Sequence, residues 1–138
     1  MRQINMNKDY IIEIIAKTLY AEARGEGENG IRAVATVIWN RSKIRKTTFD
    51  KICLQPKQFS CWNNSNDITT TEPDIYEVCV QIADEMVSEL FEEYEFKNIH
   101  PTNYITVKLY YSNKCPNWAR GQIGEVVGNH IFFELLYF

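Results

Sequence analysis

Residues 31–41, IRAVATVIWNR, are apolar on nearly every side of a helix, with Arg32 and Thr36 as the exceptions. A helix without a continuous polar face is normally buried by neighbours on all sides. We therefore expect this helix to be buried, with Glu28 or Asn29 capping its start.

Two amphipathic segments are expected to pack beside it. Residues 8–23 carry one stripe of isoleucine and leucine when each residue is advanced by about 100°. Residues 70–93 keep apolar side chains at i, i+3, i+4 and i+7, with Thr71 at the cap, Pro73 in the first turn and Cys79 in the core. Residues 42–70 between the second and third helices read as an irregular connection.

The amino-acid composition changes after Pro101. YITVKLYYSN and IGEVVGNHIFFELLYF are rich in β-branched and aromatic residues and contain glycine breaks, which is typical of short strands. We predict an α+β fold, a small domain that is mainly helical with a short β-rich C-terminal part. No repeat or linker divides the chain, so residues 1–138 are expected to form a single domain.

The charge balance excludes general nucleic-acid affinity. Lys and Arg number 15 against 18 Asp and Glu, which gives a net charge of −3, although a local basic face remains compatible with that total. The sequence shows neither a signal peptide nor an apolar run long enough to span a membrane. We expect a protein made as a soluble monomer, without stable membrane insertion.

The cysteines and histidines do not predict a metal site. Cys53, Cys61, Cys79 and Cys115 form no CxxC pair, and the two histidines do not supply zinc-ligand spacing. Cys53 and Cys61 flank a loop, and a disulfide between them is left open.

Glu22 falls near the centre of the apolar stripe of the first helix, whereas Glu13 and Lys17 fall on the opposite side. A glutamate at a helix end is commonly frayed, capping or ion-paired, here with Arg24 or Arg41. Burial and the negative end of a helix both favour the neutral form of a carboxyl group. A neutral carboxyl can protonate a departing sugar oxygen, so Glu22 is the candidate acid of a glycosidic cleavage.

Two segments mix amide and hydroxyl groups with flat rings, namely LQPKQFSCW and LYYSNKCPNW. Amides bond sugar hydroxyls while rings cover the C–H faces of sugars. The same composition also suits loops pinned by aromatic anchors, so both interpretations stay open. The candidate substrate-binding residues are Gln58, Phe59, Ser60, Tyr110, Tyr111, Asn113 and Trp118.

Three segments of the chain, in their order, resemble the cell-wall hydrolase family of the spore cortex-lytic enzymes, which has relatives among phage lysis proteins. They are LYAEARGEGENGIRAVATVIWNR, QPKQFSCW and LYYSN…PNW…IG…VGNHIFF. The resemblance covers roughly residues 10–133. It implies a lysozyme-like fold that cleaves glycan strands of bacterial peptidoglycan, without a metal or cofactor. The first glutamate of the family's EARGE motif is the catalytic acid and corresponds to Glu22, while Glu26 is expected to hold the turn together.

The mechanism is predicted from the lack of a poised second carboxylate. Glycosidases that use water normally pair two carboxyl groups. Asp50, Asp67 and Asp74 could supply the second carboxyl group, but none of them lies in a motif that places it for catalysis. With Glu22 as the single acid and base, we predict a lytic transglycosylase that cleaves between N-acetylmuramic acid and N-acetylglucosamine and leaves 1,6-anhydro ends. A hydrolytic muramidase and a non-catalytic peptidoglycan-binding module are the alternatives.

A thiol amidase that uses Cys61 and His130 is a further alternative, although nothing in the sequence orients such a pair. His130 is more simply interpreted as a partly buried histidine. Because a secretion signal is not found, we expect the protein to reach the wall by phage-mediated release or as a virion component.

Overall fold

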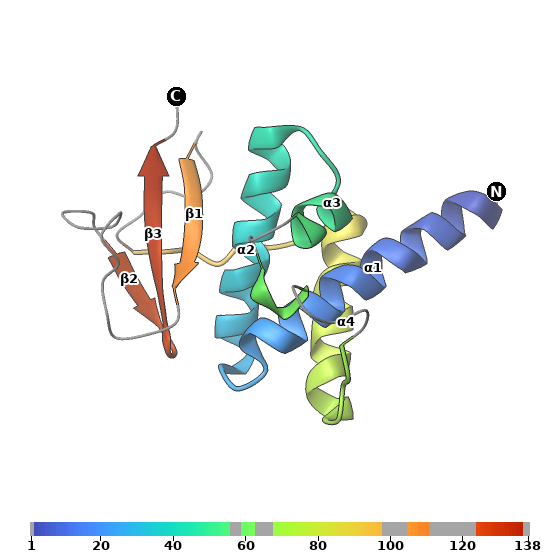
Figure 1. Ribbon diagram of the computed structural model, residues 1–138, viewed down its shortest axis with the longest axis horizontal. Coiled ribbons are helices and arrows are strands. Elements are labelled where there is room, and N and C mark those ends of the chain that lie inside the picture. The colour runs from blue at the N-terminus through green and yellow to red at the C-terminus, as the bar shows by residue number, and fades with distance from the viewer. Residues whose placement is uncertain (1, 56–58, 63–67, 98–104, 111–123, 137–138) are drawn as a thin grey trace.

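The computed structural model describes residues 2–55, 59–62, 68–97, 105–110 and 124–136. Its helices are α1 Arg2–Ala23, α2 Gly27–Arg45, α3 Phe49–Leu54, the short 3₁₀ helix η1 Ser60–Trp62 and α4 Pro73–Val87 (Figure 1). Its strands are β1 Ile105–Tyr110, β2 Gly124–Val127 and β3 His130–Leu136. The prediction of a mainly helical α+β fold with a short β-rich C-terminal part is confirmed.

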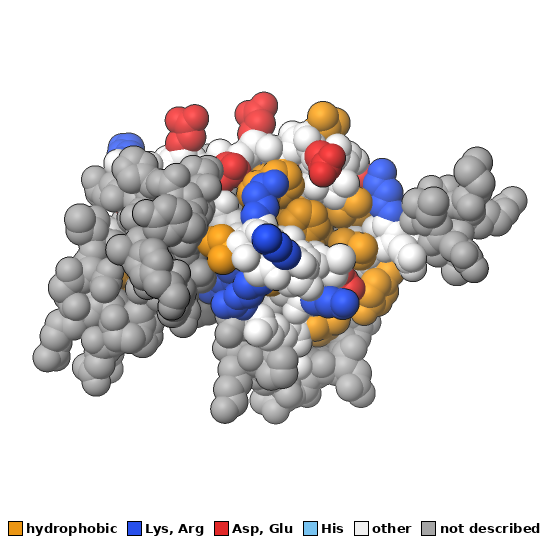
Figure 2. Space-filling view, turned by 90° about the horizontal axis from the view of Figure 1, so that it is seen from above, with side chains coloured by type: hydrophobic (Ala, Val, Ile, Leu, Met, Phe, Trp, Pro, Cys, Tyr) orange, Lys and Arg blue, Asp and Glu red, His pale blue; other side chains and the backbone are white. Residues whose placement is uncertain are grey.

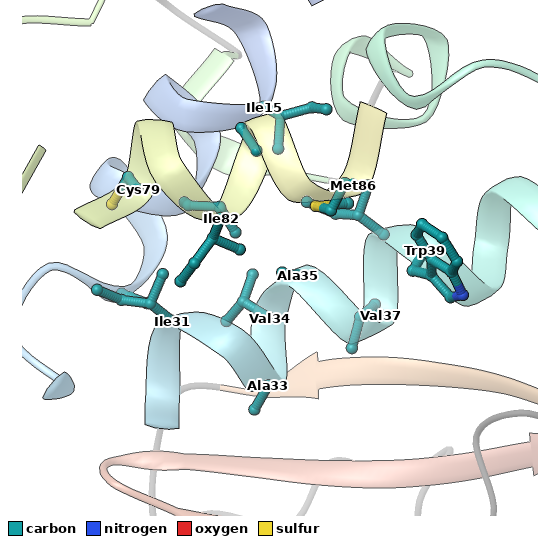
Figure 3. Close-up of a cluster of buried hydrophobic side chains, with 14 of the residues drawn as sticks. Ile15, Ile31, Ala33, Val34, Ala35, Val37, Trp39, Cys79, Ile82 and Met86 are labelled. Carbon is teal, nitrogen blue, oxygen red and sulfur yellow. The ribbon is translucent and has the colours of Figure 1, made fainter. Parts of the chain in front are cut away.

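Helix α2 lies between the sheet on one side and α1, α3 and α4 on the other (Figure 1). Residues 33–41 of this helix are all buried. Ala33 and Val37 point toward the strands, whereas Val34 points toward Ile82 of α4 (Figure 3). Because α2 has neighbours all round, it needs no continuous polar face, and its predicted burial is confirmed.

The boundaries of α2 differ from those predicted. The helix begins at Gly27, and the expected capping by Glu28 or Asn29 was wrong, because the N-cap residue is Glu26 and its side chain makes no capping hydrogen bond. The Glu26 carboxylate accepts a hydrogen bond from the backbone N–H of Asn129 at 2.6 Å instead. A tertiary contact therefore takes the place of a local cap.

The prediction of an irregular connection over residues 42–70 was wrong in part. Helix α2 continues to Arg45, and α3 and η1 follow within the same stretch. Ile52 and Cys53 of α3 are fully buried. A helix of six residues shows too little periodicity to stand out from a polar sequence.

Helix α4 packs its apolar stripe into the core, as predicted. Its buried residues are Cys79, Ile82, Ala83 and Met86. The helix ends at Val87, so the predicted extension to residue 93 was wrong; Leu90 beyond the end is 74% exposed.

The start of α4 is held by a side chain of another helix. The expected cap at Thr71 was wrong, because Glu72 is the N-cap residue and makes no side-chain capping bond. The buried Tyr20 hydroxyl of α1 accepts hydrogen bonds from the backbone N–H groups of Thr71 at 3.0 Å and Glu72 at 2.9 Å. These bonds link α1 to the beginning of α4.

The strands form an antiparallel sheet with the order β1-β3-β2. Strands β2 and β3 are joined by the turn at Gly128 and Asn129, with Val127 paired to His130. Tyr110 at the end of β1 pairs with Ile131. The end of β1 and the start of β3 therefore lie side by side. In the described part of the chain, the helices are too short or too polar to cross a lipid bilayer.

We predict that Ile82→Ala lowers the free energy of unfolding by about 2–5 kcal/mol, because it opens a cavity between α4 and α2. Ile82 is 1% exposed. Leu90→Ala is the control, since it removes a similar volume from an exposed position and should change stability by less than about 0.5 kcal/mol. Urea unfolding followed by circular dichroism measures both, and equal effects would contradict the packing described here.

Candidate active site around Glu22

Glu22 lies in the last turn of α1 and is only 5% exposed. It follows Thr18 and Ile14 at intervals of about one helical turn, and all three side chains are buried. The position inferred from helical phase, on the buried face of α1, is thus confirmed. Arg24, one of the expected ion-pair partners, pairs with Glu72 instead, with Nε and Oε1 3.8 Å apart.

The 3₁₀ helix η1 packs against α1 next to Glu22. Trp62 donates a hydrogen bond from Nε1 to Thr18 Oγ1 at 2.8 Å, and Thr18 Oγ1 donates to the carbonyl of Ile14 at 2.8 Å. The neighbouring Cys61 is hydrogen-bonded to the Glu22 carboxyl group. Burial, followed by the negative charge of Glu22, raises the pKa of the Cys61 thiol, so the thiol stays protonated at neutral pH and donates a hydrogen bond to Glu22.

His130 brings the sheet to the same region. It is the first residue of β3 and is 1% exposed. Burial lowers the pKa of its imidazole, while the carboxylates of Glu26 and Glu22 act in the opposite direction. The imidazole is therefore neutral at pH 7 and close enough to both glutamates to respond to their charge.

Glu26 has a different environment from Glu22. Its Oε1 accepts a hydrogen bond from the backbone N–H of Asn129 at 2.6 Å, and its Oε2 accepts one from Asn129 Nδ2 at 3.2 Å. Gly128 beside it has φ 64°, and a Cβ atom there would collide with Glu26 Oε1. Only glycine permits this approach. Glu26 thus ties the start of α2 to the β2–β3 turn, in agreement with the structural role expected for it.

The candidate substrate-binding residues are described only in part. Phe59 is 2% exposed, and the Arg41 guanidinium carbon lies 5.6 Å from the centre of its ring. The ring is covered like that of a core residue, which is not the exposure expected of a sugar-stacking side chain. Ser60 begins η1 and Tyr110 ends β1, but their side chains are not described. Outside the described residues lie Gln58, Tyr111, Asn113 and Trp118.

The sequence did not predict that Cys61 and His130 lie near Glu22. Cys61 was considered as a nucleophile or a disulfide partner, and His130 as a partly buried histidine or as the partner of Cys61 in a thiol amidase. Neither an unpaired cysteine nor a histidine at the start of a strand signals contact with a glutamate on a distant helix. Only the packing of η1 and β3 near the end of α1 reveals the cluster.

The surroundings of Cys61 do not favour the thiol amidase. A nucleophilic cysteine needs a lowered pKa so that the thiolate forms near neutral pH, whereas the pKa of Cys61 is raised. Cys53 and Cys61 are both free thiols, so the disulfide that the sequence left open is not formed. No cluster of His, Cys, Asp or Glu within the described ranges has an arrangement suited to a metal ion.

Comparison with known proteins identifies the family. Residues 25–133 match the family model described as Cell Wall Hydrolase. The match begins just after Glu22 and includes Glu26, Cys61 and His130. No curated protein and no solved structure matches the chain. Because the matched region covers most of the chain and agrees with the resemblance seen in the sequence motifs, this protein belongs to the cell wall hydrolase family, whose members are enzymes that degrade peptidoglycan.

Proposed function

We propose that the protein is a lytic transglycosylase that cleaves the bond between N-acetylmuramic acid and N-acetylglucosamine, with Glu22 as its only acid and base. The observation that carries this proposal is the burial of the Glu22 carboxyl group at the end of α1, where Cys61 donates a hydrogen bond to it. A carboxyl group in a desolvated position beside a protonated thiol can exchange a proton with a bound sugar.

The proposed reaction consumes no water. Glu22 donates its proton to the glycosidic oxygen, and the bond from that oxygen to C1 of the muramic acid residue breaks. The resulting carboxylate then takes the proton of the C6 hydroxyl of the same residue while O6 bonds to C1. The products are a 1,6-anhydro end and a free N-acetylglucosamine end, and Glu22 is protonated again.

The environment of Glu26 supports this route over hydrolysis. Hydrolysis by two carboxyl groups requires one of them to activate water or to bind C1. Both oxygens of Glu26 accept hydrogen bonds from Asn129, so this carboxylate is committed to the β2–β3 turn. The C6 hydroxyl of the substrate is then the nucleophile that needs no further catalytic group.

A hydrolytic muramidase remains the second candidate because of Asp50. Burial chiefly raises the pKa of the Cys53 thiol, and the charges of Asp50 and Glu22 both add to that rise. Asp50 on α3 therefore lies near the same buried thiol as Glu22. If it activated water, the product would be a reducing end instead of an anhydro end.

The remaining parts of the proposal concern the whole chain. We infer that residues 1–138 act as one catalytic domain and as a monomer, and that Gln58, Ser60, Tyr110, Tyr111, Asn113 and Trp118 contact the glycan strand. The enzyme would meet its substrate after phage-mediated release or as a virion component.

Mass spectrometry of the soluble fragments released from purified peptidoglycan distinguishes the two reactions. We predict muropeptides that are one water lighter than the corresponding reducing-end products, and no incorporation of ¹⁸O from labelled water. Reducing ends that carry ¹⁸O would identify the protein as a muramidase.

We predict that Glu22→Gln slows the release of muropeptides by roughly 10²–10⁴-fold, because the amide keeps the shape of the side chain but cannot donate a proton to the leaving group. Release is followed by liquid chromatography, and circular dichroism establishes that the variant remains folded. A folded variant with nearly full activity would show that another group is the acid. A wild-type protein that sediments with walls but releases nothing would be a binding module.

Glu26→Gln provides the matched comparison within the same motif. We expect it to retain at least about a tenth of the wild-type rate, because Glu26 supports the β2–β3 turn through hydrogen bonds and an amide can still accept one of them. The main effect of Glu26→Gln should be a lower melting temperature, and not a lower rate of muropeptide release. If a folded Glu26→Gln variant lost as much activity as Glu22→Gln, the catalytic role would have been assigned to the wrong glutamate.

A further inference from the structure

Four cationic side chains gather where α2 ends and α3 begins. Lys43, Arg45, Lys46 and Lys51 are all exposed, in a chain whose net charge is −3. Figure 2 looks onto this end of the molecule and shows Lys and Arg side chains near its middle, with most of the acidic side chains toward one rim. We call these four residues the basic face.

The cations of the basic face are not neutralised by neighbouring carboxylates. Among the residues described, Lys17, Arg24 and Arg32 form ion pairs with glutamates at 2.6, 3.8 and 3.2 Å, respectively, whereas none of the four does so. Arg45 instead donates a hydrogen bond to the neutral side chain of Gln55 at 2.6 Å.

The acidic groups nearby leave the positive charge in excess. Lys43 lies close enough to the partly buried Glu93 to oppose the rise that burial causes in the pKa of that carboxyl group. Glu89 and Asp50 also lie in this region. Concentrated positive charge of this kind costs stability through self-repulsion, which a bound anion relieves.

A pocket of about 480 Å³ opens between these side chains. Lys43 Nζ lies 4.3 Å from the centre of the Trp39 ring, and that ring stacks on Phe49 with 5.7 Å between the ring centres. The aromatic pair thus holds one ammonium group in place at the pocket. Ammonium and hydroxyl groups outnumber the single carboxylate, that of Glu89, in its described lining, which also contains apolar side chains. The ammonium and hydroxyl groups belong to Ser42, Lys43, Lys46, Thr47, Thr48 and Lys51.

We propose that the basic face binds a phosphodiester polymer of the cell wall, at a site other than Glu22. Ammonium and hydroxyl donors around a pocket complement the phosphate oxygens of such a polymer. Such binding holds the enzyme on an insoluble substrate between cleavage events. The inference rests on the wall as the target, and it does not depend on which reaction Glu22 performs.

The two sites lie toward opposite ends of α2 but are linked through α3. The 19 residues of α2 span roughly 28 Å at about 1.5 Å per residue, whereas Lys51 lies on α3, where Cys53 is near enough to Glu22 to respond to its charge. Glu22 precedes the start of this helix, and the basic face surrounds its end. A polymer that crosses the molecule can therefore occupy both sites at once, and each adds to the other's effective concentration.

Sedimentation with purified walls tests the proposal. The full chain carries Glu22→Gln so that the walls remain intact, and Lys46→Gln with Lys51→Gln removes two charges without disturbing the contact of Lys43 with Trp39. We expect roughly tenfold weaker binding at low salt, and no difference from the parent at about 1 M salt, where charges are screened within about 3 Å.

The matched control removes the same number of positive charges from another part of the protein. Lys8→Gln with Lys97→Gln removes two positive charges far from the pocket lining and should bind walls like the parent. Binding by the Lys46 and Lys51 variant that equals the parent, or an equal loss in the control, would overturn the proposal. Muropeptide release, measured separately in proteins that keep Glu22, reports on the catalytic proposal alone.

Walls stripped of phosphodiester polymers identify the source of the anion. If the difference between the variant and its parent disappears on stripped walls, the ligand is the phosphodiester polymer. If the difference persists on stripped walls, the basic face binds other anionic groups, such as the carboxylates of the peptide stems, and the proposal is overturned.

Discussion

The burial of α2 on all sides is the constraint on which the rest of the structure depends. A helix without a continuous polar face is stable only when neighbours cover it completely, and here the sheet covers one side while α1, α3 and α4 cover the other. This arrangement brings η1 and β3 toward the end of α1, where Cys61 is hydrogen-bonded to Glu22 and His130 is near enough to respond to its charge. The same helix carries the basic face at its other end, so one element sets the positions of both proposed sites.

The two glutamates of the EARGE motif show how environment separates roles. Glu22 ends α1 inside the core and is hydrogen-bonded to a thiol that keeps its proton. Glu26 lies in the following turn, and both of its oxygens are held by Asn129 of the β2–β3 turn. Residues that differ by one helical turn in sequence therefore meet different partners, and the proposal assigns proton transfer to Glu22 and support of the turn to Glu26.

Periodicity in the sequence was sufficient to predict the main helices and the burial of Glu22, and local composition was sufficient to predict the β-rich end, because each depends on side chains close in sequence. It was insufficient for the caps of α2 and α4, where Asn129 and Tyr20 provide contacts from distant parts of the chain. The same limit applies to Cys61 and His130, which join the candidate site only through tertiary packing. Phe59 was chosen for its flat ring, but composition could not reveal that the ring is covered.

The central claim is that Glu22 exchanges a proton with the glycosidic bond. A crystal structure of the Glu22→Gln variant with a bound glycan fragment tests it most directly. The account predicts that the amide at position 22 lies within about 2.6–3.2 Å of a glycosidic oxygen that follows a muramic acid residue. A glycan bound in a well-ordered groove elsewhere, with the side chain at position 22 still enclosed by the core, would contradict it.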